Sequence, residues 1–263
     1  MNRRDTSPRN DTAKSLDLTG KRSGYLALAT KPLHILVFLV PLIAFYEYGA
    51  WAYLTGDEGT RSAILAQRML ENLFSAMGAT SVHLPAILTV VVLLLWHAMT
   101  RDRWRVKPTV VLGMWGEAAV WTAPLLVLGV IIARALGVGI EPAANTEFEA
   151  ATLGERLTIA IGAGLYEELL FRLLGITLFM LLFEDLLRFG KKQSAVLALL
   201  LTSVAFAWYH DPRLASGAYD WPLAGYYAIA GAYFGLIYVF RGFGIVVGVH
   251  ALYDLVVLVD PLG

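Results

Sequence analysis

Residues 162–172 read GAGLYEELLFR, and this stretch decides how the rest of the chain must fold. It lies inside an apolar run over residues 157–183 that is long enough to cross a bilayer. Glu167, Glu168 and Arg172 therefore fall near the middle of an expected membrane span. An unpaired charge at that depth costs at least a few kcal/mol, and ionisable residues inside a membrane usually mark a functional site. We therefore expect the function to be centred on these three side chains.

The composition indicates a polytopic α-helical membrane protein. Of the 263 residues, 57% are hydrophobic and 16% are charged, whereas a soluble domain is roughly 45–50% apolar and about 25% charged. The 21 basic and 21 acidic residues balance, so the overall charge suggests no nucleic-acid partner. The chain has no cysteine, which excludes a disulfide framework, a Cys-ligated metal and a thiol protease.

Apolar runs of span length predict seven transmembrane helices. The expected spans cover residues 34–54, 84–99, 115–136, 157–183, 195–209, 223–240 and 245–259. Between the first two, residues 56–78 place apolar side chains at helical spacing with charges between them, which is typical of an amphipathic helix at the membrane interface. If that helix also spans, the count is eight. The expected fold class is all-α, a polytopic bundle of about seven or eight membrane helices.

Charge along the chain predicts its regions and its orientation. We expect a basic cytoplasmic tail over residues 1–33, N-terminal membrane helices over 34–140, and a membrane core carrying the polar motifs over 141–263. Alternating the seven spans places the tail and the basic loops 101–107 and 188–192 on one side, and the acidic residues of loop 141–155 on the other. This arrangement follows the positive-inside rule and predicts an integral, multi-pass protein with a cytoplasmic N-terminus.

The charges of the central span are expected to divide into a pair and a free carboxylate. Glu168 and Arg172 are four residues apart, so they share a helix face in the favourable order for an ion pair. Glu167 is rotated about 100° away and is left able to hold a water or a metal ion. On this interpretation Arg172 neutralises and orients Glu168.

Two other spans supply complementary groups. His210 closes the fifth span, and His250 and Asp254 lie four residues apart in the last one. A carboxylate and an imidazole that share a water can activate it by general-base catalysis. The further imidazole and carboxylate groups can ligate a metal or stabilise an oxyanion. This chemistry predicts hydrolysis, most naturally of a peptide bond.

The three motifs occur in a specific order: E-E-x-x-x-R at Glu167–Arg172, F-x-x-x-H at Phe206–His210 and H-x-x-x-D at His250–Asp254. In this order, each within an apolar helix, they resemble the CAAX protease and bacteriocin-processing (CPBP) family of intramembrane proteases. That family includes the Ras-converting CAAX endopeptidase and many bacterial proteins, and its last motif ends in Asn or Asp. The resemblance covers residues 153–259, and the first half of the chain carries no recognised motif.

The resemblance implies roles for these residues. Glu167 and His210 would activate the attacking water, and His250 and Asp254 would complete the site as metal ligands or as oxyanion stabilisers. Bound metal, a divalent ion such as zinc, would then have Glu167, His210, His250 and Asp254 as ligands. Glu168 and Arg172 would support the site. An Asp at position 254, where the family more often has Asn, adds a negative charge that favours a metal or a protonated carboxyl group.

We therefore expect an intramembrane endopeptidase of the glutamate or metallo type, assisted by a metal, in a bacterial plasma membrane. Its partners would be the lipid bilayer and a membrane-anchored, lipidated or amphipathic peptide or protein substrate. Two alternatives stay open. One is a non-catalytic membrane chaperone or immunity-type protein that binds peptides, and the other is a proton-coupled transporter using Glu47, Glu167 and Asp254.

The predicted spans leave one geometric conflict. Glu167 lies near mid-membrane, His210 at the outer end of its span and His250 only about five residues from an inner end, so their depths differ by more than one site allows. Helix tilt, a broken helix or shifted boundaries must close that gap.

Residues outside the motifs have simpler interpretations. His34, His83 and His97 lie near span ends and are expected to be interface residues. Glu117 is expected at a solvated helix start. Two G-x-x-x-G pairs, Gly231/Gly235 and Gly244/Gly248, predict close helix packing.

Overall fold

The structure is a computed structural model that describes residues 24–56, 59–60, 64–79, 81, 83–136, 151–213 and 216–259. The basic residues of the expected tail up to Arg22, and Glu141, Glu147 and Glu149 of the expected acidic loop, lie outside these ranges. Within the described residues the fold is helical apart from one small hairpin, in which β1 (Thr55–Gly56) pairs antiparallel with β2 (Gly59–Thr60). The all-α prediction is therefore confirmed.

The helices follow the order of the apolar runs. The N-terminal half contains α1 (Tyr25–Ala29), α2 (Pro32–Tyr53), α3 (Leu65–Ala76), α4 (Leu84–Thr100) and α5 (Pro108–Leu136). The C-terminal half contains α7 (Leu153–Glu167), the π-helix η2 (Glu168–Ile176), α8 (Thr177–Met180), the π-helix η3 (Leu181–Leu186), α9 (Lys191–Tyr209), α10 (Trp221–Arg241) and α11 (Phe243–Val259).

Four described helices are long and apolar enough to cross a membrane: α2, α5 over Pro108–Ile132, α9 and α10. Two shorter apolar helices, α4 and the Phe243–Leu258 part of α11, accompany them. Helix α3 has 12 residues, about 18 Å of helix, which is too short for a hydrocarbon core about 30 Å thick. Helix α3 is thus not among the described helices that are long enough to span, and the count of seven or eight spans stays a prediction. The protein is an integral membrane protein.

The outer faces of these helices are as apolar as a lipid environment requires. Large hydrophobic side chains project outward from them, among them Leu95 of α4, Val120 of α5, Leu200 of α9 and Phe240 of α10. In water such a surface would be an extended apolar patch, whereas in a bilayer it contacts acyl chains. The apolar outer surface suits contact with lipid, whereas the charged side chains of Glu167, Glu168 and Arg172 are buried among the helices.

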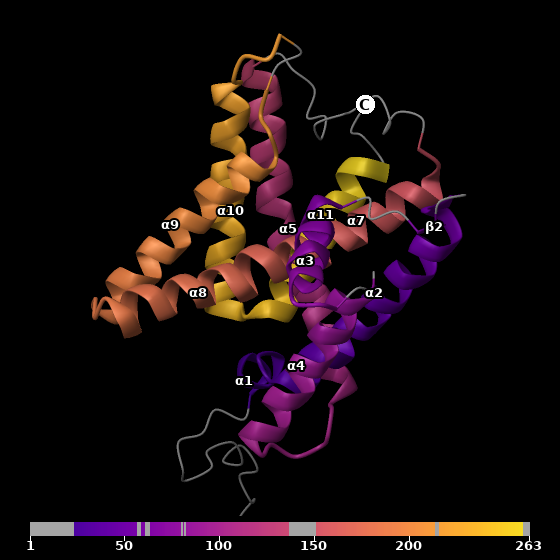
Figure 1. Cartoon of the computed structure of the whole chain (residues 1–263), viewed down its shortest axis with the longest axis vertical. Helices are drawn as coiled ribbons and strands as arrows, with labels where there is room; N and C mark the ends of the chain where they lie inside the picture. The colour runs from indigo at the N-terminus through magenta and orange to yellow at the C-terminus, as the bar shows by residue number, and fades with distance from the viewer. Residues whose placement is uncertain are drawn as a thin grey trace, which may run out of the picture.

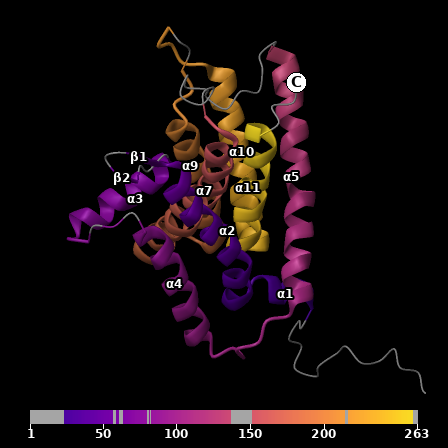
Figure 2. The same ribbon diagram turned by 90° about the vertical axis from the view of Figure 1, so that its right-hand side faces the viewer.

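Helix α11 is the central element. It packs along α7 and α5, and it also contacts α10 and α2. In Figure 1, α5 and α10 stand upright while the segment from α7 to α8 runs across them at a steep angle. Figure 2 shows α5 at one edge of the view and α3 and α4 toward the opposite edge, with α2 crossing the middle. Helix α9 lies against α10.

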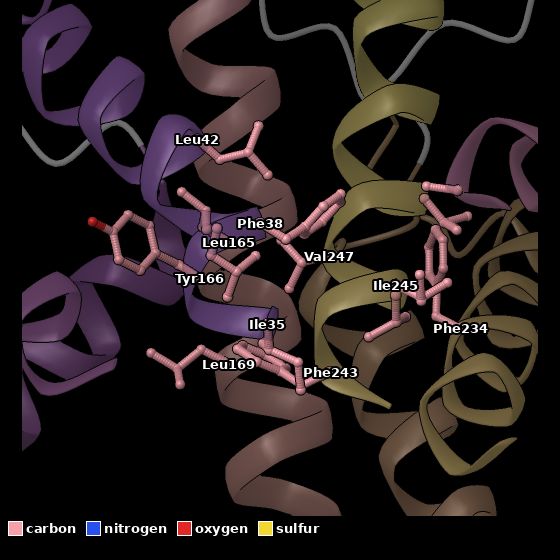
Figure 3. Close-up of a cluster of buried hydrophobic side chains, with 14 of the residues drawn as sticks. Ile35, Phe38, Leu42, Leu165, Tyr166, Leu169, Phe234, Phe243, Ile245 and Val247 are labelled. Atoms are coloured by element: carbon pink, nitrogen blue, oxygen red, sulfur yellow. The ribbon is translucent and has the colours of Figure 1, made fainter. Parts of the chain in front are cut away.

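The hydrophobic core is built where these helices meet. Figure 3 shows Phe38 of α2, Leu165 of α7, Val247 of α11 and Phe234 of α10 within one cluster of buried side chains. Residues 245–251 of α11 are all buried. A side chain on this stretch is therefore held by packing on every side.

Glycines allow the closest helix contacts. A Cβ at Gly164 would lie 2.6 Å from the backbone nitrogen of Ala251, so α7 and α11 touch there backbone to backbone. Gly248 lies against Phe38 and Ala118, and Gly231 lies against Ser203. The predicted close packing of the two G-x-x-x-G pairs is confirmed, since Gly235 and Gly244 also lie against side chains of neighbouring helices.

Two helix starts and one glutamate differ from expectation. Helix α5 begins at Pro108 rather than near residue 115, and α7 begins at Leu153 rather than near residue 157. Thr152 and Glu155 form a capping box that fixes the start of α7.

The expectation that Glu117 lies at a solvated helix start was wrong because α5 starts earlier than predicted. Glu117 is in mid-helix and accepts hydrogen bonds from Arg241 and from the hydroxyl of Tyr25, the latter at 2.5 Å.

Two of the three histidines expected at the interface are instead buried. His34 and His97 are 2% and 1% exposed. Nε2 of His34 accepts a hydrogen bond from the backbone N–H of Lys107 at 3.3 Å, and the His97 ring packs edge-on against Trp104. Only His83 has an exposed side chain, and it contacts Glu47.

Substituting Gly164→Ala should destabilise the protein. The added methyl group meets the backbone of Ala251, which cannot rotate away, and overpacking of this kind costs about 1–3 kcal/mol. Thermal unfolding in detergent measures the effect. Gly116→Ala is the matched control, because nothing lies within 4 Å of its added Cβ and the helix should tolerate or gain from it. Equal melting temperatures for the two variants would contradict the close contact.

Candidate active site

The helix that carries the two glutamates changes its hydrogen-bonding pattern at the site. It is an α-helix up to Glu167 and a π-helix from Glu168 to Ile176. A π-helical turn contains more residues than an α-helical turn, so successive side chains are rotated by less. Such segments are frequent at functional sites. The change of register between Glu167 and Glu168 lets both carboxylates reach the same neighbour on α11.

Glu168 and Arg172 form the expected pair. Arg172 Nη1 lies 3.0 Å from Glu168 Oε1, and both side chains are fully buried. Arg172 Nη2 donates a hydrogen bond to the carbonyl oxygen of Gly231 at 3.1 Å. The guanidinium also lies over the ring of Phe206, 4.4 Å from its centre. Ion pairing, hydrogen bonding and cation–π contact together compensate the charge in this buried position.

His250 connects the two glutamates. Its Nδ1–H donates to Glu168 Oε1 at 2.7 Å, and its Nε2 lies 3.8 Å from Glu167 Oε2 and 3.5 Å from Asp254 Oδ2. The imidazole stacks on the ring of Phe234, with centroids 4.5 Å apart. Glu168 therefore fixes the orientation of the ring, and its Nε2 edge faces the other two carboxylates.

His210 approaches Glu167 from the C-terminal end of α9. Its Nδ1 lies 2.8 Å from the carbonyl oxygen of Phe206, and because a carbonyl can only accept, Nδ1 carries the hydrogen. In the neutral ring Nε2 then presents a lone pair. That nitrogen lies 3.6 Å from Glu167 Oε2. Stacking on Tyr227, at 4.3 Å between ring centroids, holds the imidazole in place.

The two oxygens of Glu167 have different surroundings. Oε1 accepts a hydrogen bond from the hydroxyl of Tyr209 at 3.1 Å. Oε2 is buried and has no hydrogen-bond donor among the described residues, although the Nε2 atoms of His210 and His250 face it. A buried carboxylate oxygen without a donor requires a hydrogen-bonding ligand. A water that donates to Oε2 and to Nε2 of His210 meets this requirement.

The structure brings together the residues that the sequence placed at different depths. Glu167, His210, His250 and Asp254 form one connected cluster, with 3.5–3.8 Å between their nearest polar atoms. Two features close the gap. The segment from α7 to α8 runs obliquely across α5 and α10, as Figure 1 shows, so it is strongly tilted relative to those helices. The backbone contact at Gly164 then brings α11 close enough for His250 to reach both glutamates.

The side chains of the cluster are of the types that bind a divalent metal, but they are not arranged as a metal site. The imidazoles of His210 and His250 and the carboxylates of Glu167 and Asp254 are typical zinc ligands. With Glu168 included, the three carboxylates outnumber the single guanidinium of Arg172, so an added positive charge would be favourable. However, within the described ranges no group of three or more His, Asp or Glu side chains is arranged to hold a metal ion.

Glu47 lies outside this cluster. It contacts the imidazole of His83, and its Oε1 accepts from the hydroxyl of Tyr166 at 3.5 Å. A cavity of about 330 Å³ between α2 and α4 is lined by Glu47, His83, Ile43 and Val90, among others. Glu47 and His83 thus form a separate pair at this mostly apolar cavity.

Sequence reasoning missed the aromatic enclosure and the hydroxyl of Tyr209. Phe206 and Phe234 pack against both Arg172 and His250. Tyr209 immediately precedes His210, which was the one signal available. Its contact with Glu167 depends on how α9 crosses α7, and no local pattern encodes that crossing.

Comparison with known proteins agrees with the motifs. Residues 150–256 match the family described as type II CAAX prenyl endopeptidase Rce1-like. The match confirms the resemblance to CAAX proteases over the segment that contains every residue of the cluster. No curated protein and no solved structure matches the chain.

Replacing Arg172 alone should destabilise the protein strongly. Arg172→Met leaves Glu168 as a buried carboxylate without its cation, and breaking a buried pair from one side costs about 3–5 kcal/mol. The double variant Glu168→Gln/Arg172→Met removes both charges and should recover most of the loss. Lys192→Met, at an exposed position of α9, serves as control. Denaturant unfolding in detergent gives these values, and equal losses in the single and double variants would refute the pairing.

Proposed function

We propose, from the match of residues 150–256 to the Rce1-like family, that this protein is an intramembrane endopeptidase that uses Glu167 as its general base. The observation that carries the proposal is the position of Glu167 Oε2, which faces the Nε2 atoms of two imidazoles inside an apolar bundle and accepts no hydrogen bond from the described residues. A water held there has one acceptor for each of its hydrogens and keeps its oxygen lone pairs free for attack.

The proposed reaction balances on these groups. Glu167 Oε2 takes a proton from the water as its oxygen bonds to the scissile carbonyl carbon. His210, whose Nε2 accepts the second hydrogen, holds the water in line because its Nδ1–H is committed to the carbonyl of Phe206. Glu167 then returns the proton to the leaving nitrogen as the carbon–nitrogen bond breaks. General-base catalysis of this kind contributes about 10²–10⁴-fold to rate.

His250 and Asp254 are proposed to face the developing oxyanion or to hold a divalent metal. Glu168 fixes the ring of His250 through Nδ1, so Nε2 has a defined direction. A protonated Nε2 would donate to the oxyanion, whereas a bound metal would supply Lewis-acid polarisation of the carbonyl. The excess of carboxylates over cations in the cluster supports either a metal or a proton at this position.

The proposed substrate is a membrane-anchored peptide, lipidated or amphipathic, because the site lies among apolar helices. The family's description names a CAAX prenyl endopeptidase, and in C-terminal CaaX sequences a prenyl lipid is attached to the cysteine. The location proposed is a bacterial plasma membrane. The orientation proposed, with the N-terminus in the cytoplasm, is supported by the distribution of basic loops along the sequence.

Glu167→Gln should abolish cleavage while the protein stays folded. The amide cannot accept a proton, so turnover of a prenylated CaaX peptide in proteoliposomes should fall at least about 100-fold, measured by mass spectrometry of the released C-terminal fragment. Asp185→Asn, an exposed carboxylate on the same long helix, should retain full activity. Undiminished turnover by the Glu167→Gln protein would sink the assignment, and if cells carrying only this variant behaved normally, a peptide-binding role would be favoured.

Metal content separates the two roles proposed for His250. If the cluster binds a metal, wild-type protein should contain about one equivalent of a divalent ion by mass spectrometry, and His250→Ala should lose it. His83→Ala is the control, since His83 contacts Glu47 away from the cluster. Metal-free, active wild-type protein would instead assign water activation to Glu167 and His210 alone.

A further inference from the structure

Helix α3 is connected to the catalytic carboxylate through a single hydroxyl group. The backbone N–H of Ala66 donates to the hydroxyl oxygen of Tyr209 at 3.0 Å, and that hydroxyl donates to Glu167 Oε1 at 3.1 Å. Ala66 lies in the first turn of α3, where backbone N–H groups have no partner within the helix. Tyr209 therefore satisfies an otherwise unpaired donor of α3 and reaches Glu167 at the same time.

The direction of these bonds is fixed by chemistry. A backbone N–H can only donate, so the Tyr209 oxygen accepts from Ala66. Its one hydrogen then goes to Glu167, because a carboxylate accepts. Oε1 is thereby occupied, and Oε2 is the oxygen left for the water. The hydroxyl decides which carboxylate oxygen faces His210 and His250.

The ring of Tyr209 is held independently of its hydroxyl. It packs edge-on against Phe171 and against His210, with ring centroids 5.2 and 5.0 Å apart. Removing the oxygen while keeping the ring therefore leaves the packing of the site intact.

Helix α3 holds its place through one face only. Ala66 and Leu70 are buried, while Leu65, Met69 and Leu73, each four residues apart, are exposed. The buried face fixes the first turn against the protein, and Ile64 at the start of the helix lies against Gly162 of α7. An element outside the three motifs thus sets the position of the base.

We propose that Tyr209 is a positioning residue for Glu167, and that the first turn of α3 holds Tyr209 in place. The inference rests on the proposed function of Glu167 as general base. It extends the active site to a helix outside the segment that matches the protease family.

Tyr209→Phe should lower kcat about tenfold and leave KM within twofold, because the loss concerns the orientation of the base and not substrate binding. The matched control is Tyr233→Phe, which removes one hydroxyl that donates to the backbone carbonyl of Trp121 on α5 and should change neither constant. Both are assayed on the prenylated CaaX peptide in proteoliposomes. A kcat equal to wild type overturns the proposal, and so does a change confined to KM.

Two further measurements separate positioning from general damage. Hydrogen exchange at the Ala66 amide should accelerate in Tyr209→Phe and not in Tyr233→Phe, and unchanged exchange overturns the link to α3. In a Glu167→Asp background, whose shorter carboxylate no longer reaches the hydroxyl, Tyr209→Phe should cost less than twofold; an undiminished tenfold loss there overturns action through Glu167. Activity of Glu167→Gln would refute the proposed function itself, whereas an inactive Glu167→Gln with a fully active Tyr209→Phe refutes only this inference.

Discussion

The structure depends on compensating a buried positive charge inside an apolar bundle. Arg172 cannot lose its proton under physiological conditions, so the fold must provide partners for it. Glu168, the carbonyl of Gly231 and the face of Phe206 do so from three helices. Each partner fixes a helix: the π-segment, α10 and α9. The charge that makes the central span costly is therefore also the group that determines how the surrounding helices assemble.

The contacts of Arg172 also determine how His250 and His210 are oriented. Glu168 is held by Arg172 and in turn holds Nδ1 of His250, which leaves Nε2 facing Glu167 and Asp254. Phe206 contacts Arg172 and also accepts from His210, so the same residue sets both the cation and the second imidazole. Catalysis requires reacting side chains that are held in a fixed geometry by rigid neighbours, since side chains that are free to move contribute much less to the rate.

Much of this could be predicted from the sequence, and the exceptions have physical causes. Spacing alone predicted the Glu168–Arg172 pair, because four residues bring side chains together on one helix. It could not predict that Glu167 and Glu168 would share His250, since that depends on a π-helical register that no residue pattern specifies. His34 and His97 were misplaced because proximity to a span end says nothing about which face of the helix is buried. Glu117 was misassigned because α5 starts earlier than predicted, and its partner Arg241 lies over a hundred residues away in the sequence.

The contact between α3 and Tyr209 could not be predicted from the three motifs. The three motifs name side chains, whereas the orientation of Glu167 also depends on a backbone N–H at Ala66, which any residue other than proline would supply. Such a contact leaves no mark in the sequence of α3. Of this connection, only Tyr209 is a side chain that can be identified in the sequence. Its hydroxyl has one hydrogen, so it accepts from the Ala66 N–H and donates to the Glu167 carboxylate. The site therefore extends beyond its motifs. The orientation of the Glu167 carboxylate is set in part by α3, a helix that contributes no side chain to the chemistry.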